Sequence, residues 1–163
     1  MRAEVIAIGD ELTSGVRLDT NSQWLSLHLE ELGISVAFHT VVGDGMDAII
    51  NVLRTAVGRA EVAVITGGLG PTADDLTRQA LGILTGQPLV RHAEVVEHIR
   101  ALFERRGRVM PERNEIQAHF PAGAEVIANP DGTAPGVYLC APASRQGQKC
   151  HLFALPGVPA EMK

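Results

Sequence analysis

The protein has 163 residues, 45% of them hydrophobic and 20% charged, so we expect a single domain over residues 1–163 with a sizeable core. Lys and Arg total 14 against 19 Asp and Glu, a formal net charge of −5, which excludes a nucleic-acid-binding protein that depends on bulk positive charge. Without a membrane-length apolar stretch or a signal-like apolar start, the sequence predicts a cytoplasmic protein with no membrane partner.

The first half of the sequence alternates strand-like and helix-like segments. Apolar runs at residues 4–8, 34–42 and 62–65 predict strands, and apolar residues at helical spacing predict helices over 20–33 and 46–58. Thr20 and Gln23 match a capping box, which predicts Thr20 as the N-cap residue. Continuous apolar strands alternating with amphipathic helices predict a mostly parallel sheet covered on both faces.

The second half is less regular. A helix is expected to end at Gly86, a second one spans residues 94–106, and residues 112–119 form a short helix. Strands are predicted over 125–127, 136–140 and 151–155, and the last two could form a hairpin across residues 144–149.

The densest motif runs from Thr66 to Thr77, where the third strand passes into a helix. Three glycines there leave backbone N–H groups free to cradle an anion: Gly67, Gly68 and Gly70. Asp74 and Asp75 follow, in what we expect to be the first helical turn. In one interpretation Thr72 and Asp75 form a capping box; in the other, a divalent cation bridges the carboxylates and phosphate oxygens.

Further acids follow the other predicted strands. Because the loops after neighbouring parallel strands meet at one edge of the sheet, we expect the acids to surround one pocket: Asp10, Glu11, Asp19, Asp44, Asp74 and Asp75. Their hard oxygen atoms suit Mg²⁺ or Mn²⁺. Each acid taken alone is explained as a turn or capping residue, and the argument for a site is their shared placement after strands.

Two later segments have alternative interpretations. The loop over residues 129–136 is either a lid or ribose-binding wall, or a plain surface loop, and Pro156 and Gly157 could add a backbone wall to the same pocket. The arginines near the end of the 94–106 helix could meet phosphate from the same or a neighbouring subunit, or simply form a solvated helix end: Arg100, Arg105, Arg106, Arg108 and Arg113.

Together, the segments 7–12, 19–21, 66–77, 132–136 and 155–162, with Asn114 and Gln117, resemble the N-terminal domain of the CinA (competence/damage-inducible protein) family. The wider resemblance is to the molybdopterin-binding fold of the MoaB, Mog and MoeA proteins. It implies a three-layer α/β/α domain that forms homo-oligomers. It also implies that the 163 residues are the N-terminal part of a longer chain with a C-terminal amidase-like domain.

The resemblance implies metal-dependent hydrolysis of the pyrophosphate bond of ADP-ribose or a related nucleoside-diphosphate sugar, in pyridine-nucleotide recycling. Its cofactors would be a divalent metal (Mg, Mn or Co) and potassium. The molybdenum-cofactor relatives instead imply a molybdopterin-type binding module without hydrolysis, and a structural or regulatory domain of a larger chain is a third alternative.

The hydrolase hypothesis assigns roles to named residues. The predicted catalytic residues are Asp10, Glu11, Asp74 and Asp75, and the predicted metal ligands are Asp10, Asp74 and Asp75. The predicted substrate-binding residues are Gly67, Gly68, Gly70, Thr72, Asp19, Asn21, Asp44, Asn114, Gln117, Gly132, Pro135, Gly136, Pro156 and Gly157.

Overall fold

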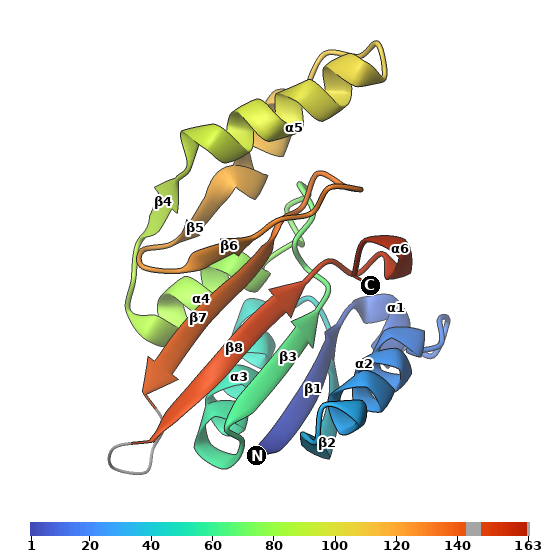
Figure 1. Ribbon diagram of the computed structural model, residues 1–163, viewed down its shortest axis with the longest axis vertical. Coiled ribbons are helices and arrows are strands. Elements are labelled where there is room, and N and C mark those ends of the chain that lie inside the picture. Colours follow the sequence, from blue (N-terminus) through green and yellow to red (C-terminus); the bar gives the residue numbers. More distant parts are fainter. Residues whose placement is uncertain (143–147, 163) are drawn as a thin grey trace.

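The centre of the molecule is a six-stranded, mostly parallel sheet. The computed structural model describes residues 1–142 and 148–162. The strand order is β2-β1-β3-β8-β7-β6, with β1, β2, β3 and β8 parallel and β7 antiparallel to its two neighbours (Figure 1). The strands are β1 (Arg2–Ile8), β2 (Ser35–Val42), β3 (Val62–Thr66), β6 (Glu125–Ile127), β7 (Gly136–Pro142) and β8 (Lys149–Leu155).

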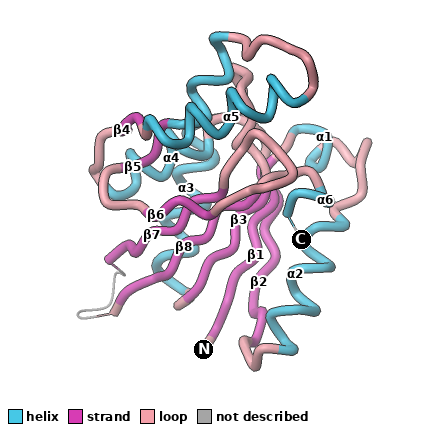
Figure 2. The backbone as a smooth tube through the Cα atoms, turned by 45° about the horizontal axis from the view of Figure 1, so that its top comes forward, coloured by secondary structure: helices cyan, strands magenta, loops and turns pink. Residues whose placement is uncertain are grey.

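Helices cover the sheet on both sides, which makes three layers. The helices are α1 (Asp10–Thr13), α2 (Thr20–Glu31), α3 (Met46–Arg59), α4 (Thr77–Thr85), α5 (Ala93–Arg105), the 3-10 helix η1 (Glu112–Ala118) and α6 (Pro159–Met162). Helices α2 and α6 lie on one face, and α3 and α4 lie on the other (Figures 1 and 2). The predicted parallel sheet between helical layers is therefore confirmed. In the described part of the chain, no helix is both long and apolar enough to cross a membrane.

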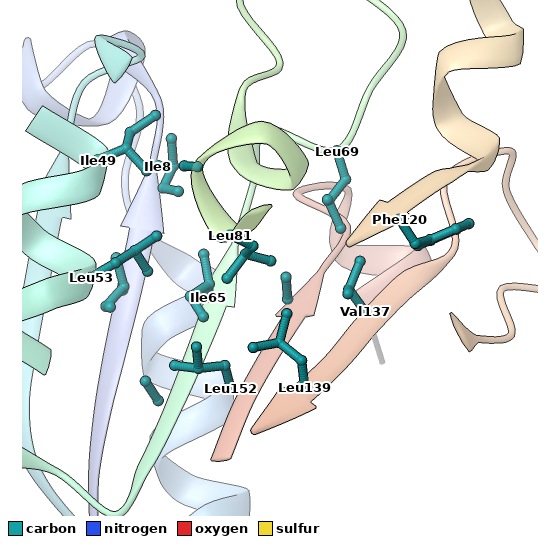
Figure 3. Packing of buried hydrophobic residues seen from close by; sticks show 14 of the residues in the cluster. Ile8, Ile49, Leu53, Ile65, Leu69, Leu81, Phe120, Val137, Leu139 and Leu152 are labelled. Atoms are coloured by element: carbon teal, nitrogen blue, oxygen red, sulfur yellow. The ribbon is translucent and has the colours of Figure 1, made fainter. Parts of the chain in front are cut away.

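The continuous apolar strands serve both helical layers, because alternate side chains of a strand point to opposite faces. Ile6 and Ile65 belong to the larger core beside α3 and α4. Figure 3 shows Ile65 in this core together with Leu53 of α3 and Leu81 of α4. Val5 and Val64 belong to the smaller core under α2. Because β1, β2, β3 and β8 run parallel, their carboxyl ends lie at one edge of the sheet.

Residues 89–121 form an arm that projects from the sheet (Figure 1). Its base is a two-stranded antiparallel sheet of β4 (Leu89–Arg91) and β5 (His119–Pro121). Helix α5 forms the long part of the arm. The inner side of α5 is anchored in the larger core through Val95, Val96 and Ile99. The arm is therefore packed onto the rest of the domain through the larger hydrophobic core.

Several local predictions were wrong. Asp19 is the N-cap residue of α2, with its carboxylate accepting a hydrogen bond from the Ser22 N–H at 2.9 Å, so Thr20 is the first residue of the helix and not its cap. Asp74 and Asp75 precede α4, which begins at Thr77.

Other elements were missed or only partly predicted. Residues 10–13 form the short helix α1, where a loop was predicted, and the three-residue strands β4 and β5 were not foreseen. Strands β7 and β8 pair in antiparallel fashion as predicted, but residues 143–147 of their connection lie outside the described residues.

Candidate functional site

A cleft of about 430 Å³ lies at the carboxyl edge of the parallel strands. The loops after β1, β2, β3 and β8 contribute its walls, which is the place where open α/β sheets bind ligands. The predicted site residues that line this cleft are Glu11, Asp19, Asn21, Asp44, Gly67, Gly68, Gly70, Asp74, Asp75, Gln117, Pro156 and Gly157. The loops after the parallel strands therefore meet at one edge of the sheet, as the sequence predicts.

Two other predicted site residues, Asp10 and Asn114, do not line the cleft but bond to residues that do. The Asp10 carboxylate accepts a hydrogen bond from the Asp44 N–H at 3.0 Å, and the Asp44 carboxylate accepts one from the Asp10 N–H at 3.0 Å. Asn114 is buried and donates to the Gln117 side-chain oxygen at 2.9 Å. Asp10 and Asn114 thus support Asp44 and Gln117, which line the cleft.

Three predicted residues of the 129–136 loop also lie outside the cleft. Gly132 is buried, and a side chain there would collide with the Glu161 carboxylate. Pro135 is buried, and Gly136 is the first residue of β7. Thr133 and Ala134 of this loop line the cleft in their place, so the loop does form part of the wall.

Glycines allow three strand ends to touch. Gly67 has a φ of 102°, which favours glycine, and a side chain there would overlap the carbonyl oxygen of Ile8. Its N–H donates to the Leu155 carbonyl at 3.2 Å. Gly157 lies against it, since a Cβ at Gly157 would stand 3.3 Å from the Gly67 Cα. The ends of β1, β3 and β8 therefore meet at backbone distance.

Asn21 ties the same loops together with its side chain. Its Nδ2 donates to Thr66 Oγ1 at 3.0 Å and to the Gly157 carbonyl at 2.8 Å. Thr66 Oγ1 in turn donates to the Pro156 carbonyl at 3.2 Å. Asn21 stays a predicted ligand-binding residue, and the structure shows that its side chain links the loops that form the cleft.

Arg78 supports the glycine turn from beneath and was missed by the sequence analysis. Its side chain is fully buried and donates to the carbonyl oxygens of Leu69 at 2.6 Å and Gly70 at 2.7 Å. Burial lowers the pKa of this guanidinium to about 10. A basic residue at the start of a helix opposes the helix dipole, and that unfavourable position was the available signal.

The Asp75 side chain also holds the glycine turn in place. One of its carboxylate oxygens accepts from both the Thr72 N–H at 2.9 Å and Thr72 Oγ1 at 2.5 Å, and a Cβ at Gly70 would collide with this carboxylate. Thr72 is exposed and lies outside the cleft lining. The Thr72–Asp75 pair therefore closes a turn that precedes α4, and it does not cap the helix.

The acids around the cleft influence one another. Burial raises the pKa of Asp44, and the negative charges of Asp10, Glu11 and Asp74 raise it further. The polar groups of Thr72 and the backbone N–H of Asp74 itself lower the pKa of the exposed Asp74 carboxyl. The cleft therefore has one carboxylate that holds its proton more tightly than usual and one that loses it more easily.

The described lining is strongly acidic. Arg17 is the single cation in it, against the six carboxylates of Glu11, Asp19, Asp44, Asp74, Asp75 and Glu161. Arg17 and Glu161 were not predicted. In residues 1–142 and 148–162, no three His, Cys, Asp or Glu side chains form a group that could hold a metal ion. The described carboxylates therefore do not make up a complete metal site by themselves.

A family model described as "Probable molybdopterin binding domain" matches residues 4–163. A CinA structure from Thermoplasma acidophilum aligns with a TM-score of 0.86 at 31% identity, covering 99% of this chain and 92% of that one. The chain belongs to the CinA family. A CinA-like protein from Koribacter versatilis is 43% identical over 163 residues, 100% of this chain and 39% of that protein.

A second CinA-like protein, from Synechococcus elongatus, is 45% identical over 161 residues, 99% of this chain and 37% of that protein. The chain therefore spans less than two fifths of the length of these curated CinA relatives. The tungsten cofactor synthesizing protein MoaB from Pyrococcus furiosus shares the fold, with a TM-score of 0.65 at 20% identity over 99% of this chain and 84% of that one.

Proposed function

We propose that this CinA-family domain is a cytoplasmic hydrolase that cleaves the pyrophosphate bond of ADP-ribose or a related nucleoside-diphosphate sugar in pyridine-nucleotide recycling. The observation that carries the proposal is the convergence of an anion-binding glycine turn and several carboxylates on one cleft at the carboxyl edge of the sheet. Water would attack one phosphorus atom, the bridging P–O bond would break, and the products would be AMP and ribose 5-phosphate.

The glycine turn would hold the phosphates. Gly67, Gly68 and Gly70 line the cleft without side chains, so the N–H groups of Gly68 and Gly70 can approach phosphate oxygens closely. The Gly67 N–H was expected to do the same, but it already donates to the Leu155 carbonyl. Buried Arg78 holds the carbonyls of this turn away from the ligand and adds a positive charge beneath it. These features favour an anionic ligand despite the acids around it.

A divalent cation would need oxygens from the ligand as well as the cleft carboxylates, because the described side chains alone form no metal site. Asp44 lies close enough to Glu11 and Asp74 for their charges to raise its pKa, and hard oxygen donors suit Mg²⁺, Mn²⁺ or Co²⁺. When bound, such a cation would offset the charge of the phosphates and act as a Lewis acid. Mg²⁺ in proteins takes one or two carboxylates and completes its shell with phosphate and water, which agrees with the partial donor set here. We also expect potassium to support activity.

Asp44 is the best placed proton acceptor for the attacking water. General bases work best when their pKa lies near the working pH, and Asp44 is the cleft carboxylate whose pKa is raised. Its hydrogen bond from the Asp10 N–H orients the carboxylate. Of the predicted metal ligands, Asp74 is the one we still expect to hold the cation, because Asp10 pairs with Asp44 and Asp75 pairs with Thr72. Glu11, predicted as a catalytic residue, would join Asp74 there.

The test is incubation with ADP-ribose and Mg²⁺, Mn²⁺ or Co²⁺, with and without K⁺, followed by chromatographic detection of AMP. We expect Asp44→Asn to lower kcat about 100-fold, since general base catalysis contributes on that order. Asp47→Asn, an exposed carboxylate in the first turn of α3, is the matched control and should retain activity. Absence of AMP with every metal would reject the hydrolase.

A molybdopterin-type binding module is the second candidate, and the description of the matching family model favours it. The same glycine turn would then hold a pterin phosphate without hydrolysis. Calorimetry with a pterin phosphate and with ADP-ribose separates the two. Tight pterin binding without ADP-ribose turnover would establish the binding module.

A further inference from the structure

The arm carries exposed arginines that form no ion pair within the described part of the chain. Arg105, Arg106 and Arg108 are exposed around the turn that follows α5. In the described structure none of the three has an ion-pair partner, whereas Arg100 pairs with Glu97 and Arg91 pairs with Glu115. We call residues 105–109 the arm tip. Its last residue, Val109, is 91% exposed, so the tip also presents an apolar side chain.

The cleft, in contrast to the arm tip, has an excess of negative charge. Its described lining has six carboxylates and one guanidinium. A divalent cation would offset the charge of a pyrophosphate but would leave most of these carboxylates unbalanced. Two apolar side chains on the cleft wall are exposed as well, Leu18 at 83% and Val158 at 53%. The cleft therefore has an excess of negative charge and two exposed apolar side chains without a partner surface, and the arm tip offers positive charge and an apolar side chain.

The arm tip does not line the cleft of its own chain. To reach it, α5 would have to leave the larger core, where Val96 is 1% exposed and Ile99 is fully buried. The turn itself is fixed, since Gly107 has a φ of 65° and the Arg108 N–H donates to the Phe103 carbonyl at 3.0 Å. Figure 2 shows the arm extending past the sheet, with this turn at its outer end.

We propose that two copies of this chain pair so that the arm tip of each one docks at the cleft mouth of the other and completes its site. The arginines of one copy face the carboxylates and the bound phosphates of the other, and Val109 packs against Leu18 and Val158. A twofold axis satisfies both arms at once. The inference rests on the proposed function, because the phosphate-bearing ligand is what the added arginines serve.

The first experiment measures association without substrate. Sedimentation should show a dimer that dissociates as the salt concentration rises, because charged contacts are screened. Arg108→Glu should raise the dimer dissociation constant about tenfold or more. Arg54→Glu, an exposed arginine on α3 that also lacks an ion-pair partner in the described residues, is the matched control and should leave it unchanged.

Crosslinking locates the contact. In a Cys140→Ser background, which removes the exposed native thiol, a mixture of Leu18→Cys and Val109→Cys proteins should give a covalent dimer with a short bismaleimide. The control mixture pairs Val109→Cys with Ile83→Cys, which is 52% exposed on α4, and should not crosslink. A monomer at all concentrations, or a dimer that crosslinks equally in both mixtures, would overturn the proposal.

Mixing inactive variants tests completion of the site. Asp74→Asn damages the cleft and keeps the arm, whereas Arg108→Glu keeps the cleft and damages the arm. If the arm acts across the dimer, a re-equilibrated mixture should recover about a quarter of wild-type ADP-ribose turnover, because half of the dimers are mixed and each has one intact site. No recovery from two inactive variants would reject action across the dimer. A protein that dimerises and crosslinks as expected but never cleaves ADP-ribose would reject the hydrolase and keep the docking.

Discussion

Carboxylates at the two ends of the sheet differ in whether they have a positively charged partner. Glu4, near the amino end of β1, is fully buried and accepts hydrogen bonds from Arg59 Nε at 2.8 Å, Arg59 Nη2 at 2.6 Å and Thr40 Oγ1 at 2.7 Å. At the carboxyl edge, the described acids of the cleft have no ion-pair partner, and repulsion contributes to the raised pKa of Asp44.

The difference separates structural charge from functional charge. A buried carboxylate must be compensated within the fold, because an isolated buried charge costs several kcal/mol. Exposed carboxylates that repel one another cost less, since water screens them, and they leave oxygens available to a ligand. The amino end therefore stabilises the sheet, while the carboxyl edge retains electrostatic energy that a bound cation or a basic partner can relieve.

Removing the partner of Glu4 should give the largest effect. Arg59→Met leaves a buried carboxylate without its guanidinium, and we expect a loss of about 3 kcal/mol in the free energy of unfolding. Urea denaturation measures it. Arg54→Met on the same helix is the control and should change stability by less than about 0.5 kcal/mol, as exposed sites do. Equal effects of the two variants would show that the pair contributes little.

Arg78→Met should cause the second largest loss in the free energy of unfolding. The variant leaves the carbonyls of Leu69 and Gly70 without their donor, but it also removes a buried charge, so the net cost should be about 2 kcal/mol. Turnover should fall more than stability would explain, because the glycine turn loses its support. Denaturation and kinetics on the same preparation distinguish the two effects. Full activity with an unchanged KM would show that the turn holds its shape without Arg78.

Periodic features were predictable from sequence, and long-range pairs were not. Apolar runs indicated β1, β3 and the layered sheet, because burial on both faces leaves a simple pattern. Glu4 stands in such a run, and nothing local shows that it pairs with Arg59 far along the chain. Strands β4 and β5 are three residues each, too short for a pattern. At the site, placement after neighbouring parallel strands located most acids of the cleft, but it missed Glu161, and Arg78 acts through backbone carbonyls that no motif describes.

Asp75→Asn should have a smaller effect, a loss of about 1 kcal/mol, since the amide keeps one acceptor for Thr72 but loses the charge that strengthens the bond. If Asp75 only braces the turn, ADP-ribose turnover per folded molecule should stay within a few-fold of wild type. Thermal unfolding and initial rates provide the two measurements. A large loss of turnover at unchanged stability would instead place Asp75 in the chemistry.

Asp44→Asn should give the smallest change in stability, and in the opposite direction. Because the pKa of Asp44 is raised by folding, the folded state holds this proton more tightly than the unfolded state. Stability from this group is therefore complete below its ordinary pKa and is lost as the pH rises through the raised one. The variant keeps an acceptor for the Asp10 N–H and carries no charge. At neutral pH it should be more stable than wild type by a few tenths of a kcal/mol after solvent screening, with the advantage disappearing in acid. Denaturation curves from acid to neutral pH test the sign. A variant that is less stable at neutral pH would mean that the Asp44 carboxylate contributes to folding in the way that Glu4 does, and the contrast between the two ends of the sheet would be wrong.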